Sequence, residues 1–146
     1  MNYLKLISYA TMMLTIGTAN CQDLSSHQWK DRLVLVLFDS VSITTYQDQI
    51  KQFQENENGL NDRKLIIYHI NPKQYKRGLL NSNWQRSKRL INQYKKTDTH
   101  FEIILIGLDG GIKWRQTEFV SCKELFAVID VMPMRRAEIN KKEKRN

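Results

Sequence analysis

The sequence predicts a single three-layer α/β domain with a four-stranded mixed sheet, in the order β-α-β-α-β-β-α. Three apolar runs have the length of buried strands, and segments with helical spacing follow the first two of them. A strong turn sequence after the third run predicts that the chain returns as a fourth strand. The 146 residues, 41% of them hydrophobic, suffice for one domain with one sizeable core.

The first strand and helix are predicted between residues 33 and 59. Leu33–Phe38 (LVLVLF) is continuously apolar, which is typical of a strand buried on both faces. Thr44 and Gln47 form a capping-box pattern, and Asn58-Gly59 predicts where the helix ends. The apolar positions at helical spacing between them are Tyr46, Ile50 and Phe53.

The second strand is expected at Leu65–Ile70 (LIIYHI), and Pro72 ends it. Because a helix joins this strand to the first, the two strands should be parallel. Ser82 and Gln85 form another capping-box pattern, which predicts a second helix. The apolar stripe of that helix consists of Trp84, Ile91 and Tyr94.

The third strand is expected at Phe101–Leu108 (FEIILIGL). Asp109-Gly110-Gly111 is a strong hairpin turn, so Ile112–Val120 is expected to return as the fourth strand. Ser121 with Glu124 then predicts a capped last helix. The apolar side chains of that helix are Leu125, Val128, Ile129 and Met132.

Both ends of the chain are expected to lie outside the domain itself, which should span residues 24–134. Lys5 followed by an apolar run at Leu6–Thr18 matches a secretory signal peptide over residues 1–20. The basic C-terminal tail at residues 135–146 follows a helix-ending proline and is expected to fray.

The signal predicts an exported mature chain, periplasmic or secreted. The apolar run is too short to span a bilayer comfortably, since spanning takes about 20 apolar residues. Cys21, directly after the run, could be lipid-anchored as the first residue of a bacterial lipoprotein, although Asn20 stands where a small residue is expected. A buried N-terminal helix or strand is the alternative interpretation of the run.

Positive charge is concentrated in one middle segment and in the tail. The chain has a net charge of +8, and Lys73–Lys96 contains eight basic residues and no acidic one. This favours an anionic polymer or the envelope surface as partner, with Arg86, Lys88 and Arg89 as the basic surface. The alternative is a solvated helix face, and nucleic acid is not expected to meet an exported protein.

Three segments resemble a known family of exported domains. The order of elements is that of the thioredoxin fold without its first strand, and Trp29–Arg32 (WKDR), Leu105–Arg115 (LIGLDGGIKWR) and Leu125–Glu138 (LFAVIDVMPMRRAE) carry the resemblance. The chain resembles, over about residues 24–140, a domain-of-unknown-function family with a C-terminal IDxMPMRxxE signature. That family is similar to thioredoxin-like and peroxiredoxin-like proteins and to domains of sushi-repeat-containing matrix proteins. Leu108 departs from the family, which more often has Lys there. The resemblance implies a fold and export, but no activity.

The usual redox position of a thioredoxin-like fold carries no cysteine. A reactive thiol is favoured at the start of the helix after the first strand, where the sequence has Asp39–Thr45 (DSVSITT). His100 stands where redox enzymes of this fold carry a proline before the third strand. The sequence therefore argues against a dithiol oxidoreductase.

Cys122 and His100 are the catalytic candidates, because the topology places both at that same sheet edge. A Cys–His pair there would support a thiol-dependent oxidoreductase or peroxidase-like enzyme. The competing interpretations are a buried apolar Cys122 or a disulfide with Cys21. The three histidines have no metal-ligand spacing, so no metal and no cofactor is expected.

The residues of the family resemblance should gather at the opposite sheet edge. The predicted binding or clasp residues are Trp29, Arg32, Asp109, Gly110, Arg135 and Arg136. The expected acidic partners of these arginines are Asp109, Asp130 and Glu138. Trp29 is expected to pack near Met132 or Met134. A structural clasp is favoured over a ligand site, and the favoured function is a non-catalytic binding or structural module of the cell envelope.

Overall fold

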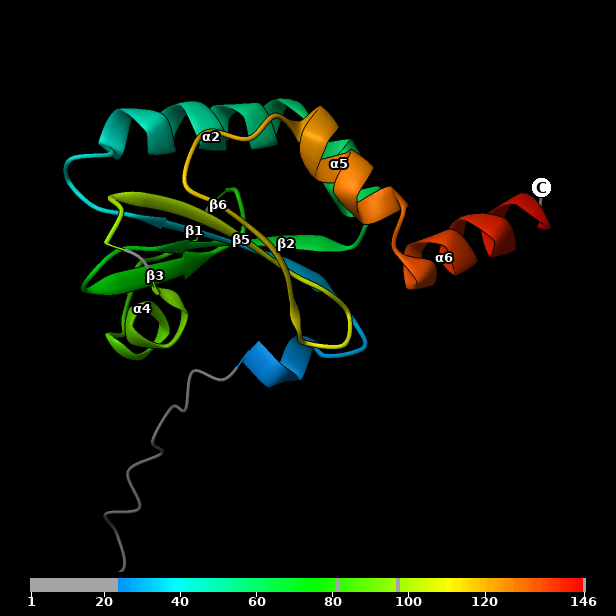
Figure 1. Ribbon diagram of the computed structural model, residues 1–146, viewed down its shortest axis with the longest axis horizontal. Coiled ribbons are helices and arrows are strands. Elements are labelled where there is room, and N and C mark those ends of the chain that lie inside the picture. The colour runs from blue at the N-terminus through cyan, green and yellow to red at the C-terminus, as the bar shows by residue number, and fades with distance from the viewer. Residues whose placement is uncertain (1–23, 81, 97, 146) are drawn as a thin grey trace, which may run out of the picture.

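The computed structural model describes residues 24–80, 82–96 and 98–145. Within these residues six strands form one sheet in the order β4-β3-β2-β1-β5-β6 (Figure 1). The strands are β1 (Arg32–Phe38), β2 (Leu65–Ile70), β3 (Gln74–Arg77), β4 (Gln85–Arg86), β5 (Phe101–Ile106) and β6 (Ile112–Gln116). β1 and β2 are parallel and the other neighbouring pairs are antiparallel. The expected signal peptide and Cys21 lie outside the described residues.

Helices cover both faces of the sheet, so the domain has three layers (Figure 1). The helical elements are η1 (Leu24–His27), α2 (Ile43–Glu55), α3 (Glu57–Asp62), α4 (Arg89–Tyr94), α5 (Cys122–Asp130) and α6 (Pro133–Glu143). α2, α3 and α5 pack on one face, whereas η1 and α4 pack on the other. α6 continues away from the sheet beyond α5.

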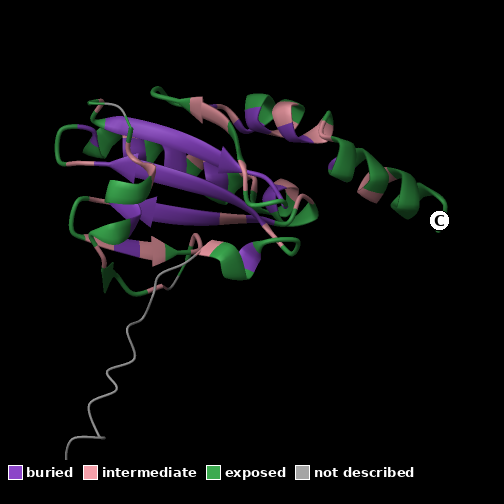
Figure 2. Cartoon of the chain, turned by 60° about the horizontal axis from the view of Figure 1, so that its bottom comes forward, coloured by how far each residue is buried: buried purple, intermediate pink, exposed green. Residues whose placement is uncertain are grey.

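β1 is the centre of the fold and is buried along its whole length (Figure 2). Alternate side chains point to opposite faces of a strand. Accordingly, Val34 and Val36 belong to the core under α2 and α5, whereas Leu33, Leu35 and Leu37 belong to the core under α4. This explains why the run is continuously apolar instead of alternating.

The prediction of a four-stranded sheet is wrong, because the second crossover is a β-hairpin with a short helix. The Asn71 side chain accepts hydrogen bonds from the backbone N–H groups of Lys73 and Gln74, which turns the chain straight after β2. β3 then pairs with β2, and β4 pairs with β3. Gln85, expected inside a capped helix, is therefore in a strand, and the helical part is only α4.

The predicted helix ends are partly correct. The capping box of Ser121 and Glu124 is confirmed at α5. At α2 the expected box of Thr44 and Gln47 is wrong, because the helix begins after Ser42. Gly59 lies inside α3, where a Cβ atom would come within 2.6 Å of the Phe126 ring. The glycine at this position therefore permits close helix packing and does not end a helix.

The charged tail is helical where fraying was expected. α6 runs from Pro133 to Glu143, and Pro133 occupies its first turn, where a missing N–H costs no hydrogen bond. Arg135 is buried although the helix as a whole is mostly exposed (Figure 2). The tail is thus attached to the domain through its first turn.

Candidate functional site

A polar cluster closes the sheet edge at the start of α2. One carboxylate oxygen of Asp39 accepts hydrogen bonds from the backbone N–H groups of Val41 (2.9 Å) and Ser42 (3.3 Å), and the other lies 2.6 Å from His100 Nδ1. Ser42 Oγ donates to the His100 carbonyl oxygen at 2.7 Å. The hydrogen bond with His100 is the main reason that the pKa of Asp39 lies below its usual value. Asp39, not a thiol, is the partner of His100.

Cys122 is the first residue of α5 and lies in the hydrophobic core, 3% exposed. Its thiol donates weakly to the Gln52 carbonyl oxygen at 3.8 Å. Burial raises the pKa of Cys122 to about 11, so the thiol stays protonated at neutral pH. The side chain of His100 is 62% exposed and points to Asp39. The two catalytic candidates therefore lie at one edge but do not form a pair.

At the opposite edge, charged side chains join α3, α5 and α6. Arg135 donates from Nη1 to the Asp62 carbonyl oxygen (2.9 Å), from Nη2 to the Asp62 carboxylate, and from Nε to Asp130 Oδ1 (3.2 Å). Arg63 binds the Asp130 carboxylate through two nitrogens, at 3.0 and 2.6 Å. Asp130 thus binds two guanidinium groups, those of Arg63 and Arg135.

Glu138 extends this network to the first strand. Arg32, only 1% exposed, donates from Nη1 to the Arg63 carbonyl oxygen at 2.9 Å and to Glu138 Oε2 at 3.2 Å. Arg135 Nη1 lies 3.5 Å from the same Glu138 oxygen. We call this network the clasp, and its members are Arg32, Asp62, Arg63, Asp130, Arg135 and Glu138.

The clasp lowers the pKa of Asp62 and of Asp130. Hydrogen bonds from Lys142 and Arg135 lower the pKa of Asp62. Burial alone would raise the pKa of Asp130, but the hydrogen bonds from Arg63 and Arg135 outweigh it and the net direction is downward. Both carboxylates are therefore ionised across the physiological pH range and keep the first turn of α6 against the domain.

Three of the predicted clasp residues take other positions. Asp109 pairs with Lys113 at 2.6 Å, and Arg136 is exposed with no ion pair among the described residues. Trp29, expected near Met132 or Met134, is 63% exposed, has a left-handed backbone (φ 65°), and donates its N–H to the Leu108 carbonyl oxygen. Gly110 has a φ of 79°, as the tight turn between β5 and β6 requires.

A cavity of about 250 Å³ lies beside the clasp. The start of α6 and the end of β5 form its walls, which are mostly apolar. The side chains that matter for its chemistry are Arg32, Leu108, Lys113, Met132, Pro133 and Met134.

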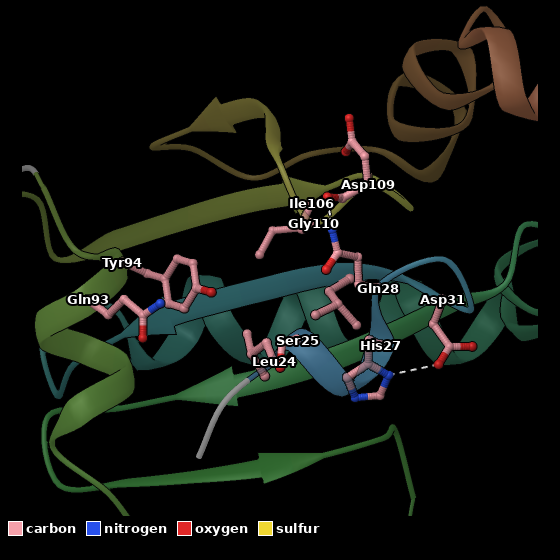
Figure 3. A pocket seen from close by; sticks show the side chains of 12 residues that line it. Leu24, Ser25, His27, Gln28, Asp31, Gln93, Tyr94, Ile106, Asp109 and Gly110 are labelled. Atoms are coloured by element: carbon pink, nitrogen blue, oxygen red, sulfur yellow. Dashed lines mark hydrogen bonds and ion pairs between the residues drawn. The ribbon is translucent and has the colours of Figure 1, made fainter. Parts of the chain in front are cut away.

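A second cavity of about 230 Å³ lies between η1, α4 and the β5–β6 turn (Figure 3). His27 is buried in its wall, with Nδ1 2.7 Å from Asp31 and Nε2 2.9 Å from the Tyr68 hydroxyl. The Gln28 side chain donates to the Asp109 carbonyl oxygen at 2.9 Å. Both nitrogens of the His27 ring are therefore occupied by the protein itself.

The predicted basic surface is exposed and lies far from the clasp. Arg86, Lys88 and Arg89 follow one another from β4 into α4, and a shallow hollow there is lined by Lys73, Arg86 and Lys88. Figure 1 shows β3 and α4 at the opposite end of the molecule from α6. The basic surface beside α4 and the basic tail in α6 are therefore separate surfaces.

The described residues contain no group of three His, Cys, Asp or Glu side chains placed to hold a metal ion. None of the helices in the described part of the chain is long and apolar enough to cross a membrane.

Comparison with known proteins identifies the family. The family model described as "Domain of unknown function (DUF4174)" matches residues 23–138. The chain belongs to this family. No curated protein matches the DUF4174 chain.

Two solved structures are similar to the DUF4174 domain. StoA from Bacillus subtilis is 15% identical, with a TM-score of 0.50, and the match covers 67% of this chain and 81% of StoA. A thioredoxin-fold protein from Helicobacter pylori is 12% identical, with a TM-score of 0.47 and coverage of 80% and 86%. At this identity the likeness to StoA concerns the fold alone. The DUF4174 domain has a thioredoxin-like α/β fold, with a six-stranded sheet.

Sequence reasoning identified some partners and missed others. Asp130, Arg135 and Glu138 were expected in a cluster, whereas Asp62 and Arg63 were not. Asp62 ends the short helix α3 and Arg63 follows it, and only packing determines the position of this helix. Asp39 was missed as well, although the antiparallel pairing of β1 and β5, with Phe38 opposite Phe101, places it next to His100.

Proposed function

We propose that this DUF4174 domain is an exported, non-catalytic binding or structural module of the cell envelope that works without thiol redox chemistry. The burial of Cys122 is the observation that carries this proposal. A nucleophilic cysteine has to be a thiolate and has to be reachable. Cys122 is 3% exposed and its pKa is raised to about 11, so it meets neither condition.

The edge where a redox thiol would act supports the same proposal. Cys21 and Cys122 are the two cysteines of the sequence, so it has no Cys-x-x-Cys motif. The start of α2 has Asp39 and Ser42 instead, and their hydrogen bonds fix the loop without a reactive group. The rival function, a thiol-dependent oxidoreductase or peroxidase using Cys122, would need His100 as its base, but the buried Cys122 thiol contacts the Gln52 carbonyl oxygen and not His100.

Export is part of the proposal and rests on the sequence. The apolar run at Leu6–Thr18 after Lys5 is a signal peptide, and the mature chain is periplasmic or secreted. The mass of the exported protein tests this: loss of about the first 20 residues supports export, and an added acyl mass on Cys21 identifies the lipid-anchored form. Retention of Met1 in exported material contradicts it.

The decisive test of the non-catalytic role is the alkylation rate of Cys122. We would use the full chain carrying Cys21→Ala, so that one thiol remains, and measure iodoacetamide labelling at pH 7.5 by mass spectrometry. A thiol pKa about two units above that of free cysteine makes the folded protein react at least about 100-fold more slowly than the same chain in urea. A folded rate close to that of free cysteine would refute the proposal, and the thiol enzyme would then be favoured.

A further inference from the structure

The cavity beside the clasp has a buried cation with an unused donor in its wall. Arg32 lines the cavity, and its Nη1 donates to the Arg63 carbonyl oxygen and to Glu138. Its other terminal nitrogen, Nη2, is buried and has no hydrogen-bond partner among the described residues. Native proteins satisfy the great majority of buried polar groups, and a charged donor without an acceptor is costly. An acceptor bound in the cavity would satisfy Nη2.

The start of α6 adds further donors to the same cavity. Pro133 and Met134, the first two residues of the helix, line it. The preceding residue, Met132, has no side-chain cap hydrogen bond, so no side chain of the N-cap satisfies the first turn. The first N–H groups of a helix have no intrahelical acceptor and form the positive end of its dipole. Because Pro133 has no N–H, the donors of this turn are the N–H groups of Met134 and Arg135. Together with Arg32, they create an environment that favours an anion.

The charges around the cavity leave a positive excess. Lys113 pairs with Asp109, so these two wall residues balance each other. Glu138 is shared by Arg32, Arg135 and the more distant Lys64 (3.8 Å). Arg135 is already paired with Asp62 and Asp130, so the excess comes from the cavity wall itself, where Arg32 and Lys113 face the single carboxylate of Asp109 and a second carboxylate can be accommodated.

The rest of the wall restricts the class of anion. Leu108, Met132, Pro133 and Met134 give the cavity a mostly apolar surface, which disfavours inorganic phosphate and favours a ligand with an apolar part. Its volume of about 250 Å³ restricts that part to a short group. The methionines are unbranched and adaptable, so they can shift to let a carboxylate reach Arg32 Nη2.

We propose that this cavity binds a carboxylate that carries a short apolar group, with Arg32 and the first turn of α6 as donors and the Met132–Met134 corner as the apolar wall. The proposal rests on the proposed role of the domain in binding and names the ligand class. A small free acid and the C-terminal residue of a peptide share this chemistry.

Titration of the ¹⁵N-labelled chain with hexanoate, followed by NMR, tests the site. Hexan-1-ol is the uncharged control, since it has the same apolar chain without the carboxylate. We expect the amides of Gly107, Leu108 and Met134 to shift with hexanoate, with a Kd at least about tenfold lower than for hexan-1-ol, as one charge-assisted hydrogen bond suffices for that factor. A tetrapeptide ending in leucine, as free acid and as amide, distinguishes the two sources. Binding of the peptide acid, but not of its amide or of hexanoate, identifies a peptide terminus as the ligand. Binding of hexanoate, but not of the peptide acid, identifies a small free acid.

Met134 offers a matched pair of variants. Met134→Glu places a negative charge at the mouth of the cavity, and a carboxylate near a helix N-terminus does not disfavour the helix. Met134→Gln has the same shape without the charge. We expect Met134→Glu to weaken hexanoate binding at least about tenfold relative to Met134→Gln, since charge repulsion opposes the ligand carboxylate.

Arg32→Gln removes the donor directly, and a thermal melt shows whether this variant folds. If it folds, hexanoate binding should be lost; if it does not, the Met134 pair decides. No shift with either acid, an equal response to hexan-1-ol, or equal binding by the two Met134 variants overturns the proposal. Such a failure leaves the alkylation result for Cys122 unaffected, so it is distinguishable from failure of the non-catalytic role.

Discussion

Replacement of Arg135 by alanine should destabilise the domain more than any other single change in the tail. The side chain is buried and binds Asp62 and Asp130, with Glu138 close by. Alanine removes the hydrogen bonds to both carboxylates and to the Asp62 carbonyl oxygen. It also removes the packing of the buried arginine stem.

The magnitude follows from how exposed the partners are. Breaking a fully buried ion pair costs about 3–5 kcal/mol, but the Asp62 and Asp130 side chains are 38% and 34% exposed, so water rehydrates them in the variant. Asp62 also keeps Lys142, and Asp130 keeps Arg63. With each pair contributing up to about 1 kcal/mol and the carbonyl hydrogen bond about 1 kcal/mol more, the expected loss is about 2–3 kcal/mol. For a domain of this size that lowers Tm by roughly 6–9 °C.

The measurement is a thermal melt by circular dichroism, supported by urea unfolding at pH 7. Arg136→Ala is the matched control, because Arg136 is the next residue of the same helix and is exposed with no ion pair among the described residues. The pKa values of Asp62 and Asp130 are lowered by folding, so their stabilisation is present above the unfolded value of about 3.8 and is lost as the pH falls below it. The difference between wild type and Arg135→Ala should therefore shrink at pH 3. Equal melting of the two alanine variants would show that the clasp does not stabilise the fold.

Two further predictions concern other parts of the molecule. Burial lowers the pKa of His69 from 6.5 to about 4, and its ring is hydrogen-bonded to Tyr46 and to the Gly78 carbonyl oxygen. The neutral ring therefore contributes its full stabilisation of the fold above pH 6.5, and this contribution falls as the pH drops toward 4. Urea unfolding should show a loss of about 2 kcal/mol between pH 6.5 and 5 that is absent in His69→Gln, and the same slope in both proteins would contradict this. Binding of the chain to vesicles that contain anionic lipid should weaken steeply with salt and weaken further in Arg86→Glu/Arg89→Glu. The reason is that the basic surface lies in a segment without acidic residues. An affinity that does not change with salt would mean that the basic surface is only solvated.

The main strands could be predicted because strands that are buried on both faces are apolar at nearly every position. β2 spans the expected Leu65–Ile70, and β1 extends the expected run by Arg32 alone. A strand between two cores needs apolar residues at every position, and such a run is visible without knowledge of its neighbours. The hairpin of β3 and β4 leaves no such trace: its strands have four and two residues, too few for a period. Its capping-box pattern at Ser82 and Gln85 matched a helix that does not begin there.

The candidate sites were likewise predictable in part. The order of the strands alone predicts that His100 lies near the start of α2 and Arg135 at the opposite edge of the sheet. Which residues share an edge could therefore be predicted. Which atoms meet depends on loops of a few residues. Arg63 follows α3 directly, and Asp39 follows β1, and neither position carries a pattern in the sequence. The buried state of Cys122, by contrast, follows from its position on the apolar face of α5, at helical spacing from Leu125 and Ile129.

The clasp and the cavity share Arg32, and this decides which variants can separate stability from binding. Arg32 Nη1 belongs to the clasp through Glu138, whereas Nη2 has no partner among the described residues, and the residue also lines the cavity. A substitution of Arg32 therefore changes both functions at once. Arg135 binds Asp62 and Asp130 and is not among the residues that line the cavity, whereas Met134 lines it and takes no part in the clasp. Arg135→Ala should consequently lower the melting temperature, and Met134→Glu should remove carboxylate binding from a chain that melts like the wild type. Because the two effects arise from different atoms, a variant pair in which both measurements change together would show that α6 docking and ligand binding are one structural event.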